Sequence, residues 1–223
     1  MVHEIAKLLQ ETFDCISGDH AETGAIKAFR QSIEHIDLDA AIRNLPAGNI
    51  PEHYQLLGSA ISQIDDQFDG LRDALMASKD ALCWQVDAGT YYSAGAEVGE
   101  AYQTGNMHTV LVGPNDAVIS SDTFLLGLFL LAPRTLYRDH KHAAPEIYVP
   151  LTGPTGWRFD KHSWEDHPAG SVIVNPPHHV HATRVYDVPF LAIFAWTQDI
   201  GSGCEVVEAA DWLQIERYLR SIP

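Results

Sequence analysis

One short segment, from residue 137 to residue 148, constrains this chain more than any other. It places two imidazoles, a carboxylate and a phenol at even-numbered positions: His140, His142, Glu146 and Tyr148. On an extended chain, successive side chains point to opposite faces, so these four groups would face one side, although Pro145 is expected to bend the run. Nitrogen and oxygen ligands that converge on one point are what a divalent metal ion needs. The segment therefore predicts a metal site.

A fourth ligand is expected downstream, where a short apolar strand, a Pro-Pro turn and a return strand lead to His181. The two stretches read HxHxxxExxxxxxG, from His140 to Gly153, and GxxxxxPxxxxH, from Gly170 to His181. Together they resemble the two-motif signature of the cupin superfamily. The first motif fits at every defining position, whereas the second has His178 where the usual residue is glycine.

Composition limits the function classes. The chain has 223 residues, with 14 Lys and Arg against 30 Asp and Glu, a formal net charge of -16. Such a charge disfavours binding to nucleic acid or to an anionic membrane, and it is compatible with solubility or with a cationic substrate. Three cysteines at unrelated spacings indicate reduced thiols and a cytoplasmic location. The N-terminus does not resemble a signal peptide, and no apolar run is long enough to span a bilayer.

The chain divides into a helical region, residues 1–80, and a β-rich domain, residues 81–223, that ends in a short helix over 209–219. Helical spacing predicts helices over 3–17 and 22–36, a short third helix stopped by Pro46, and one longer helix from about residue 51 to 75. Short apolar runs separated by turn residues predict a mainly β sandwich or barrel, and the cupin resemblance implies a jelly roll, the double-stranded β-helix. The expected strands are 82–86, 107–112, 124–131, 146–151, 156–159, 171–174, 181–185 and 190–197.

The expected ligands are His and Glu, and no cysteine lies near either motif, which suits zinc, iron, manganese, cobalt or nickel. His142, Glu146 and His181 are the main candidates, and His140 is either a ligand or a group that supports one. Each of these residues could instead be an ordinary polar residue of a barrel. The remaining histidines of this region are expected beside the site or in solvent-exposed loops: His162, His167, His178 and His179.

Tyr148 has two interpretations. A tyrosine on a barrel strand is usually a core residue with its hydroxyl satisfied. However, Tyr148 lies two residues after Glu146 and should face the same cavity. A nearby divalent cation favours the phenolate, and a phenolate near neutral pH is a competent general base.

The set Tyr137, His140, His142, Glu146, Tyr148 and His181 resembles the metal centre of the cupin-type dimethylsulfoniopropionate lyases. The helical N-terminal extension and the length are also similar to that family. The resemblance implies that His142, Glu146, Tyr148 and His181 belong to the metal centre and that Tyr148 is the catalytic base. It implies that Tyr137 and His140 assist substrate binding or catalysis.

The implied reaction is a β-elimination. The metal would bind the substrate carboxylate and acidify the α-hydrogen, Tyr148 would take that proton, and dimethyl sulfide would leave as acrylate forms. The dimethylsulfonium group is a cation, and aromatic faces attract cations by about 0.5–2 kcal/mol each. The candidate aromatic residues are Tyr102, Tyr137, Trp157, Trp164, Phe194 and Trp196.

Three other functions stay open at this point. A metal-dependent cupin dioxygenase could use the same ligands. A sugar-phosphate isomerase would need a basic phosphate-binding cluster, for which the nearby candidates are Arg138, Lys141, Arg158 and Lys161. A non-catalytic sensor of small ligands is the last, with no helix-turn-helix pattern to support it. A homodimer is compatible with the cupin resemblance.

Overall fold

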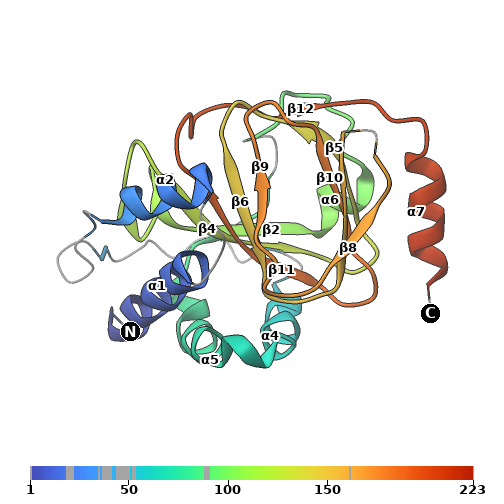
Figure 1. Ribbon diagram of the computed structural model, residues 1–223. Coiled ribbons are helices and arrows are strands. Elements are labelled where there is room, and N and C mark those ends of the chain that lie inside the picture. Colours follow the sequence, from blue (N-terminus) through green and yellow to red (C-terminus); the bar gives the residue numbers. More distant parts are fainter. Residues whose placement is uncertain are drawn as a thin grey trace.

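The computed structural model describes residues 2–18, 23–34, 36, 42–43, 51, 54–87, 91–160 and 162–222. Two β-sheets form a roll, with helices below and beside it (Figure 1). One sheet has seven strands in the order β1-β2-β4-β11-β6-β9, with β3 paired to β2 in parallel. The other sheet has five strands in the order β12-β5-β10-β7-β8. All other pairings within both sheets are antiparallel, so the predicted jelly roll is confirmed.

The strands have the following bounds. The seven-stranded sheet contains β1 (Trp84–Gln85), β2 (Asn106–Gly113), β3 (Ile119–Ser120), β4 (Leu125–Leu131), β6 (Glu146–Pro150), β9 (Ile173–Asn175) and β11 (Phe190–Trp196). The five-stranded sheet contains β5 (Leu136–Lys141), β7 (Thr155–Phe159), β8 (Glu165–His167), β10 (His181–Arg184) and β12 (Glu205–Val206). Each of the eight expected strands overlaps an observed one. The expected set lacked β3, β5, β8 and β12.

Side-chain alternation divides the seven-stranded sheet into two buried faces. In β11, Leu191 and Ile193 belong to a core shared with the N-terminal helices, whereas Phe194 and Trp196 belong to a second core inside the roll. In β6, Ile147 joins the first core and Tyr148 the second. Because successive residues face opposite sides, β6 and β11 each contribute to both cores. The interior core surrounds the candidate site.

The N-terminal helices are α1 (Val2–Ser17), α2 (Gly24–Ile33), α4 (Gln55–Ser62) and α5 (Asp69–Ser78), with 3-10 turns at Asp66–Phe68 and Lys79–Ala81. They lie below and beside the roll in Figure 1. The predicted continuous helix from residue 51 to 75 is wrong, because it divides into α4 and α5. Asp65 begins the second part by accepting a hydrogen bond from the Gln67 N–H at 3.1 Å. The predicted third helix, stopped by Pro46, lies outside the described residues.

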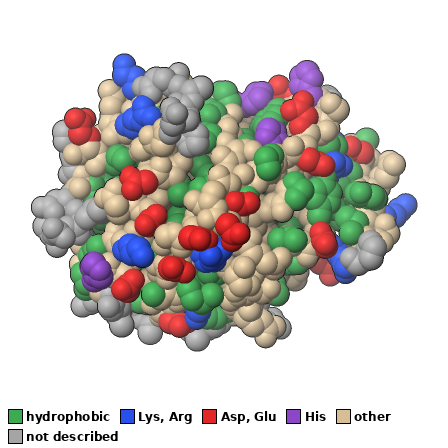
Figure 2. Space-filling view, turned by 60° about the horizontal axis from the view of Figure 1, so that its bottom comes forward, with side chains coloured by type: hydrophobic (Ala, Val, Ile, Leu, Met, Phe, Trp, Pro, Cys, Tyr) green, Lys and Arg blue, Asp and Glu red, His purple; other side chains and the backbone are tan. Residues whose placement is uncertain are grey.

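Two further helices flank the roll. The short helix α6 (Glu100–Gly105), which was not predicted, precedes β2, and α7 (Trp212–Ser221) closes the chain as expected. The face that carries α1, α4 and α5 shows Asp and Glu interspersed with fewer Lys and Arg, consistent with the negative net charge (Figure 2). Among the described residues, no helix combines the length and the hydropathy that a bilayer crossing requires.

Candidate metal centre

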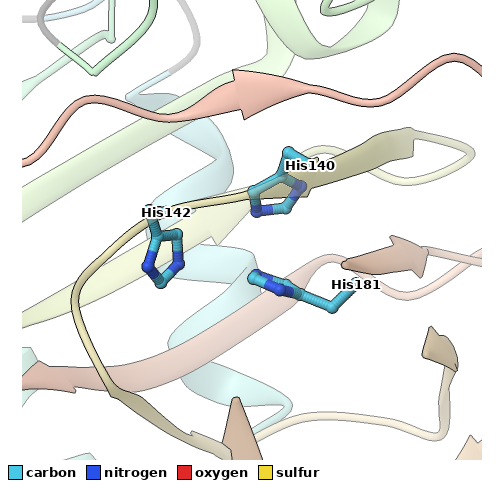
Figure 3. A group of neighbouring side chains, drawn as sticks. All are labelled: His140, His142 and His181. Carbon is cyan, nitrogen blue, oxygen red and sulfur yellow. The ribbon is translucent and has the colours of Figure 1, made fainter. Parts of the chain in front are cut away.

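Three buried imidazoles converge inside the roll. His140 lies at the end of β5, His142 follows that strand, and His181 begins β10. Their rings point toward a common space (Figure 3), and one ligand nitrogen from each lies within 4.8 Å of the other two. This convergence makes the three histidines a group that could hold one metal ion.

The backbone fixes the orientation of each ring. Nδ1 of His140 lies 2.8 Å from the Arg138 carbonyl oxygen, and Nδ1 of His142 lies 2.8 Å from the Ala144 carbonyl oxygen. Nδ1 of His181 lies 3.0 Å from the His179 carbonyl oxygen. Because a carbonyl can only accept, Nδ1 carries a proton in all three rings, which leaves Nε2 as the nitrogen that a metal would bind.

A β-bulge explains why the five-stranded sheet contributes two neighbouring side chains to one face. His181 of β10 pairs with His140, whereas Thr183 pairs with Tyr137, so two steps on β10 correspond to three on β5. The extra residue on β5 sends Arg138 and Asp139 to the outer side, where both contact α7. Tyr137 and His140 consequently both line the cavity despite their opposite parity.

Glu146 lies against the imidazoles. One of its oxygens, Oε2, is 3.3 Å from Nε2 of His142 and 3.3 Å from Nε2 of His181. Its cross-strand neighbours on both sides also bind it: Trp196 donates to Oε1 at 2.7 Å, and Asn175 donates to Oε2 at 2.9 Å. These partners hold the carboxylate at the centre of the site.

The donor set fits a transition metal. Nε2 of His181 is buried and has no hydrogen-bond partner, because the nearby Glu146 oxygen is close but not aligned with it. A buried nitrogen without a partner costs free energy, which a metal bond would remove. Three imidazole nitrogens beside one carboxylate suit zinc, iron, manganese, cobalt or nickel, and they do not select among them.

Burial and neighbouring charges act on the pKa values of the site residues, in opposite directions for His142 and Glu146. Burial lowers the pKa of His140 well below its usual value, and His181 and His142 lower it further, so this imidazole is neutral. Burial also works to lower the pKa of His142, but the charge and hydrogen bond of Glu146 outweigh it and raise that pKa. Burial works to raise the pKa of Glu146, but the two imidazoles hold it well below its usual range. Glu146 is therefore ionised.

Tyr148 lies inside the cavity, as its position two residues after Glu146 predicts. The residue is buried, and its ring packs between Trp157, at a centroid distance of 5.3 Å, and Phe194, at 6.4 Å. Burial and the charge of Glu146 raise the pKa of Tyr148 well above its usual value. These surroundings therefore favour the protonated hydroxyl.

Tyr137 also lines the cavity and is held by aromatic neighbours. Its ring stacks on His140 with a centroid distance of 4.1 Å and on Tyr102 with a distance of 4.5 Å. Its hydroxyl accepts a hydrogen bond from the Tyr92 hydroxyl at 2.8 Å. Burial raises the pKa of Tyr137 well above its usual value, so this phenol is neutral.

The cavity has mostly aromatic walls. Of the aromatic residues expected to hold a cation, Tyr102, Tyr137, Phe194 and Trp196 line it. Trp157 lies behind Tyr148, and Trp164 lies outside between two guanidinium groups, those of Arg158 at 4.7 Å and Arg184 at 4.9 Å. The lining residues that sequence reasoning missed are Asp87, Tyr91, His108, Phe129 and Cys204.

The other histidines support the site through their backbones or lie apart from it. The His178 N–H donates to the His142 carbonyl oxygen at 2.7 Å, and the side chain of His178 is exposed. His178 has φ 60°, the left-handed region that favours glycine, which explains why the second motif normally has glycine there. His179 pairs with Asp160 at 2.9 Å. His162 is exposed, and His167 packs edge-on against Phe159.

A basic phosphate-binding cluster is not formed by the expected residues that the structure describes. Arg138 pairs with Glu216 at 2.7 Å, and Lys141 pairs with Glu205 at 3.4 Å. Arg158 pairs with Asp139. None of these three lines the cavity, and Lys161 lies outside the described residues. The arrangement gives no support to a sugar-phosphate isomerase.

Known proteins resemble this chain in sequence and in fold. Residues 25–192 match the model of the DMSP (dimethylsulfoniopropionate) lyase family. Dimethylsulfoniopropionate lyase DddQ of Ruegeria pomeroyi is 28% identical over 133 residues, which span 60% of this chain and 63% of that protein, less than two thirds of its length. The crystal structure of DddQ from Ruegeria pomeroyi has a TM-score of 0.67 at 23% identity, covering 92% of this chain and 96% of that one. A structure of the DMSP lyases RdDddP and RnDddQII has a TM-score of 0.70 at 20% identity, covering 92% and 98%. These structural likenesses show the fold.

Proposed function

Because this chain belongs to the dimethylsulfoniopropionate lyase family, we propose that it cleaves dimethylsulfoniopropionate to dimethyl sulfide and acrylate with the help of a divalent metal. The observation that carries the proposal is the family match over residues 25–192. The name of the relative DddQ gives the same substrate. The site supports the proposal because three imidazoles converge, and two of them, His140 and His142, line one cavity with aromatic walls together with the Tyr148 phenol.

The metal would be held by His142, Glu146 and His181, with His140 as a further nitrogen ligand. The convergence of the three imidazoles, the shared tautomer and the unsatisfied Nε2 of His181 support this assignment. A bound divalent cation would withdraw electron density from the substrate carboxylate and would lower the pKa of the phenol beside it.

Tyr148 would act as the base. In its phenolate form, which the cation would favour, its oxygen would take the α-proton of the substrate, the C–H electron pair would form the double bond, and the C–S bond would break with its electrons leaving on sulfur. Dimethyl sulfide departs neutral, so no residue has to protonate the leaving group. Tyr137 would position the substrate, because it lines the cavity and stacks on His140.

The test is direct. Purified protein loaded separately with manganese, iron, cobalt, nickel or zinc would be given dimethylsulfoniopropionate, and dimethyl sulfide would be measured in the headspace. We expect release of dimethyl sulfide with at least one metal and without oxygen. Absence of the product with every metal would remove the lyase proposal, and consumption of oxygen would favour a dioxygenase.

The role of Tyr148 has a separate measurement. The variant Tyr148→Phe should lose at least about a hundredfold in kcat, the contribution of a general base, with unchanged metal content. The matched control Tyr218→Phe removes a hydroxyl from a side chain that is 53% exposed and should keep full activity. Normal turnover by Tyr148→Phe would assign the base to another residue. A homodimer and a cytoplasmic location stay predictions.

A further inference from the structure

The cavity has a second negatively charged group besides Glu146. Asp87 follows β1, is 6% exposed and lines the same cavity as His140 and His142. Its Oδ2 accepts a hydrogen bond from the Tyr102 hydroxyl at 3.0 Å, and its Oδ1 accepts one from the Tyr91 N–H at 3.2 Å. Its own N–H donates to Asn106 at 2.8 Å. These contacts fix the direction of the carboxylate.

Two aromatic walls connect Asp87 to the metal centre. Along one wall, Tyr102 stacks on Tyr137 and Tyr137 stacks on His140, with centroid distances of 4.5 and 4.1 Å. Along the other, the ring of Tyr91 lies edge-on to Trp196 at 5.7 Å, and Trp196 donates to Glu146. Each wall has Asp87 at one end and a candidate metal-binding residue at the other. The cavity between the walls thus has a metal-binding end and a carboxylate end.

The negative charge of Asp87 influences the pKa values of two other residues that line the cavity, Tyr91 and His108. Burial raises the pKa of the Tyr91 hydroxyl, and the negative charge of Asp87 raises it further. The same charge opposes the effect of burial on His108, whose pKa burial lowers. Among the described residues that line the cavity there is no Lys or Arg. A negative charge in a buried space with aromatic walls favours a cationic guest.

We propose that Asp87 is a specificity-determining residue that binds the positively charged end of a zwitterionic substrate, while the metal centre binds its carboxylate. The assignment rests on the proposed function, because dimethylsulfoniopropionate carries a carboxylate and a sulfonium two methylene groups apart. The aromatic faces would attract either a cation or an apolar group. Asp87 would distinguish between them by charge.

Two probes of the same shape separate charge from size. N,N-dimethyl-β-alanine carries a tertiary ammonium where the substrate carries the sulfonium, and 4-methylpentanoate carries a neutral CH group there. Both keep the carboxylate and both lack the sulfonium leaving group. Their dissociation constants from the metal-loaded protein would be measured by calorimetry, which requires no turnover.

The variant Asp87→Asn keeps the size of the side chain and removes its charge. We expect the preference for the cationic probe over the neutral probe to fall at least about tenfold, while the affinity for 4-methylpentanoate stays within about threefold of the native value. Asp87→Glu, which keeps the charge, should retain part of the preference. Asp122→Asn, at an exposed position, controls for the change in net charge and should behave as the native protein.

Two results would overturn the inference. One is that Asp87→Asn keeps the native preference for the cationic probe over the neutral probe. The other is that the variant loses affinity for both probes equally, which would mean that Asp87 only maintains the fold. Failure of the proposed function has a different signature. No metal would then give dimethyl sulfide, whereas the preference for the cationic probe could still depend on the charge of residue 87. Conversely, an active enzyme whose KM for dimethylsulfoniopropionate is unchanged in Asp87→Asn would overturn the role of Asp87 alone.

Discussion

At the scale of single residues, Glu146 sets the electrostatics of the site. It contacts two imidazoles, an indole N–H and an amide group. The pKa of His142 is raised above 6.5, so its protonated form stabilises the fold below that pH, and the contribution is lost as pH rises through the raised pKa. The pKa of Glu146 is depressed, so its contribution is present above 4.5 and is lost as pH falls through the depressed pKa. Both contributions are therefore present in mildly acidic solution.

A pH dependence follows for the metal-free protein. Compared with Glu146→Gln, the native protein should have a higher melting temperature at about pH 6, and the difference should shrink towards about pH 9, as His142 loses its proton. Any effect of the Gln side chain on its Trp196 and Asn175 contacts is the same at both pH values and leaves the trend unchanged. The measurement is calorimetry after treatment with a chelator. A difference that stays constant or grows with pH would contradict the assigned charge states.

Side chains placed in the cavity by regular strand geometry could be predicted from the sequence. Side chains placed there by contacts between distant segments could not. Glu146 and Tyr148 share a face because β6 is a regular strand, so their spacing was sufficient. Tyr137 reaches the same cavity only through the bulge in β5, which no local residue type indicates. Asp87 lies more than fifty positions before the first motif, and only the folded sheets bring the two together.

At the scale of elements, the bulge in β5 also directs two side chains, Arg138 and Asp139, towards α7, where both contact it. Asp139 is buried, accepts hydrogen bonds from Arg158 at 3.1 and 2.5 Å, and accepts another from the Trp212 indole at 2.7 Å. Arg138, the other outward residue of the bulge, pairs with Glu216 of α7 and lies over the Trp212 ring at 4.7 Å. The irregularity that brings Tyr137 and His140 into the cavity thus also holds α7 in place.

The variant Asp139→Asn should destabilise the protein by about 3 kcal/mol, because it leaves the buried guanidinium of Arg158 with a weaker partner. It should also make α7 more sensitive to limited proteolysis. Asp160→Asn is the matched control, since Asp160 is half exposed and pairs with His179 at the surface, and its effect should be below about 1 kcal/mol. Denaturant unfolding measures both variants. Equal stability of the two would mean that Asp139 does not anchor α7.

At the scale of the whole molecule, the helical region and the roll share one hydrophobic core. Leu8 and Phe29 from the helices lie in the same buried cluster as Leu128 and Ile193 from the seven-stranded sheet. Phe29 also packs edge-on against Phe124, with ring centroids 5.6 Å apart. The division at residue 80 stays a prediction about the organisation of the sequence. The shared core leads us to expect that the two parts unfold together.

The distribution of tryptophan makes this expectation measurable. All five tryptophans lie at or after residue 84, so their fluorescence reports on the roll, whereas far-ultraviolet circular dichroism reports strongly on the helices. In denaturant, both signals of the native protein should change at one midpoint. Phe29→Ala should lower both midpoints equally. The loss of unfolding free energy should be about 3–5 kcal/mol, because the variant removes a fully buried ring from the shared core. Val2→Ala, at a side chain that is 52% exposed, should shift neither. A variant whose dichroism shifts while its fluorescence does not would show that the helices fold apart from the roll, since the loss of Phe29 would then leave the sheet's own stability intact.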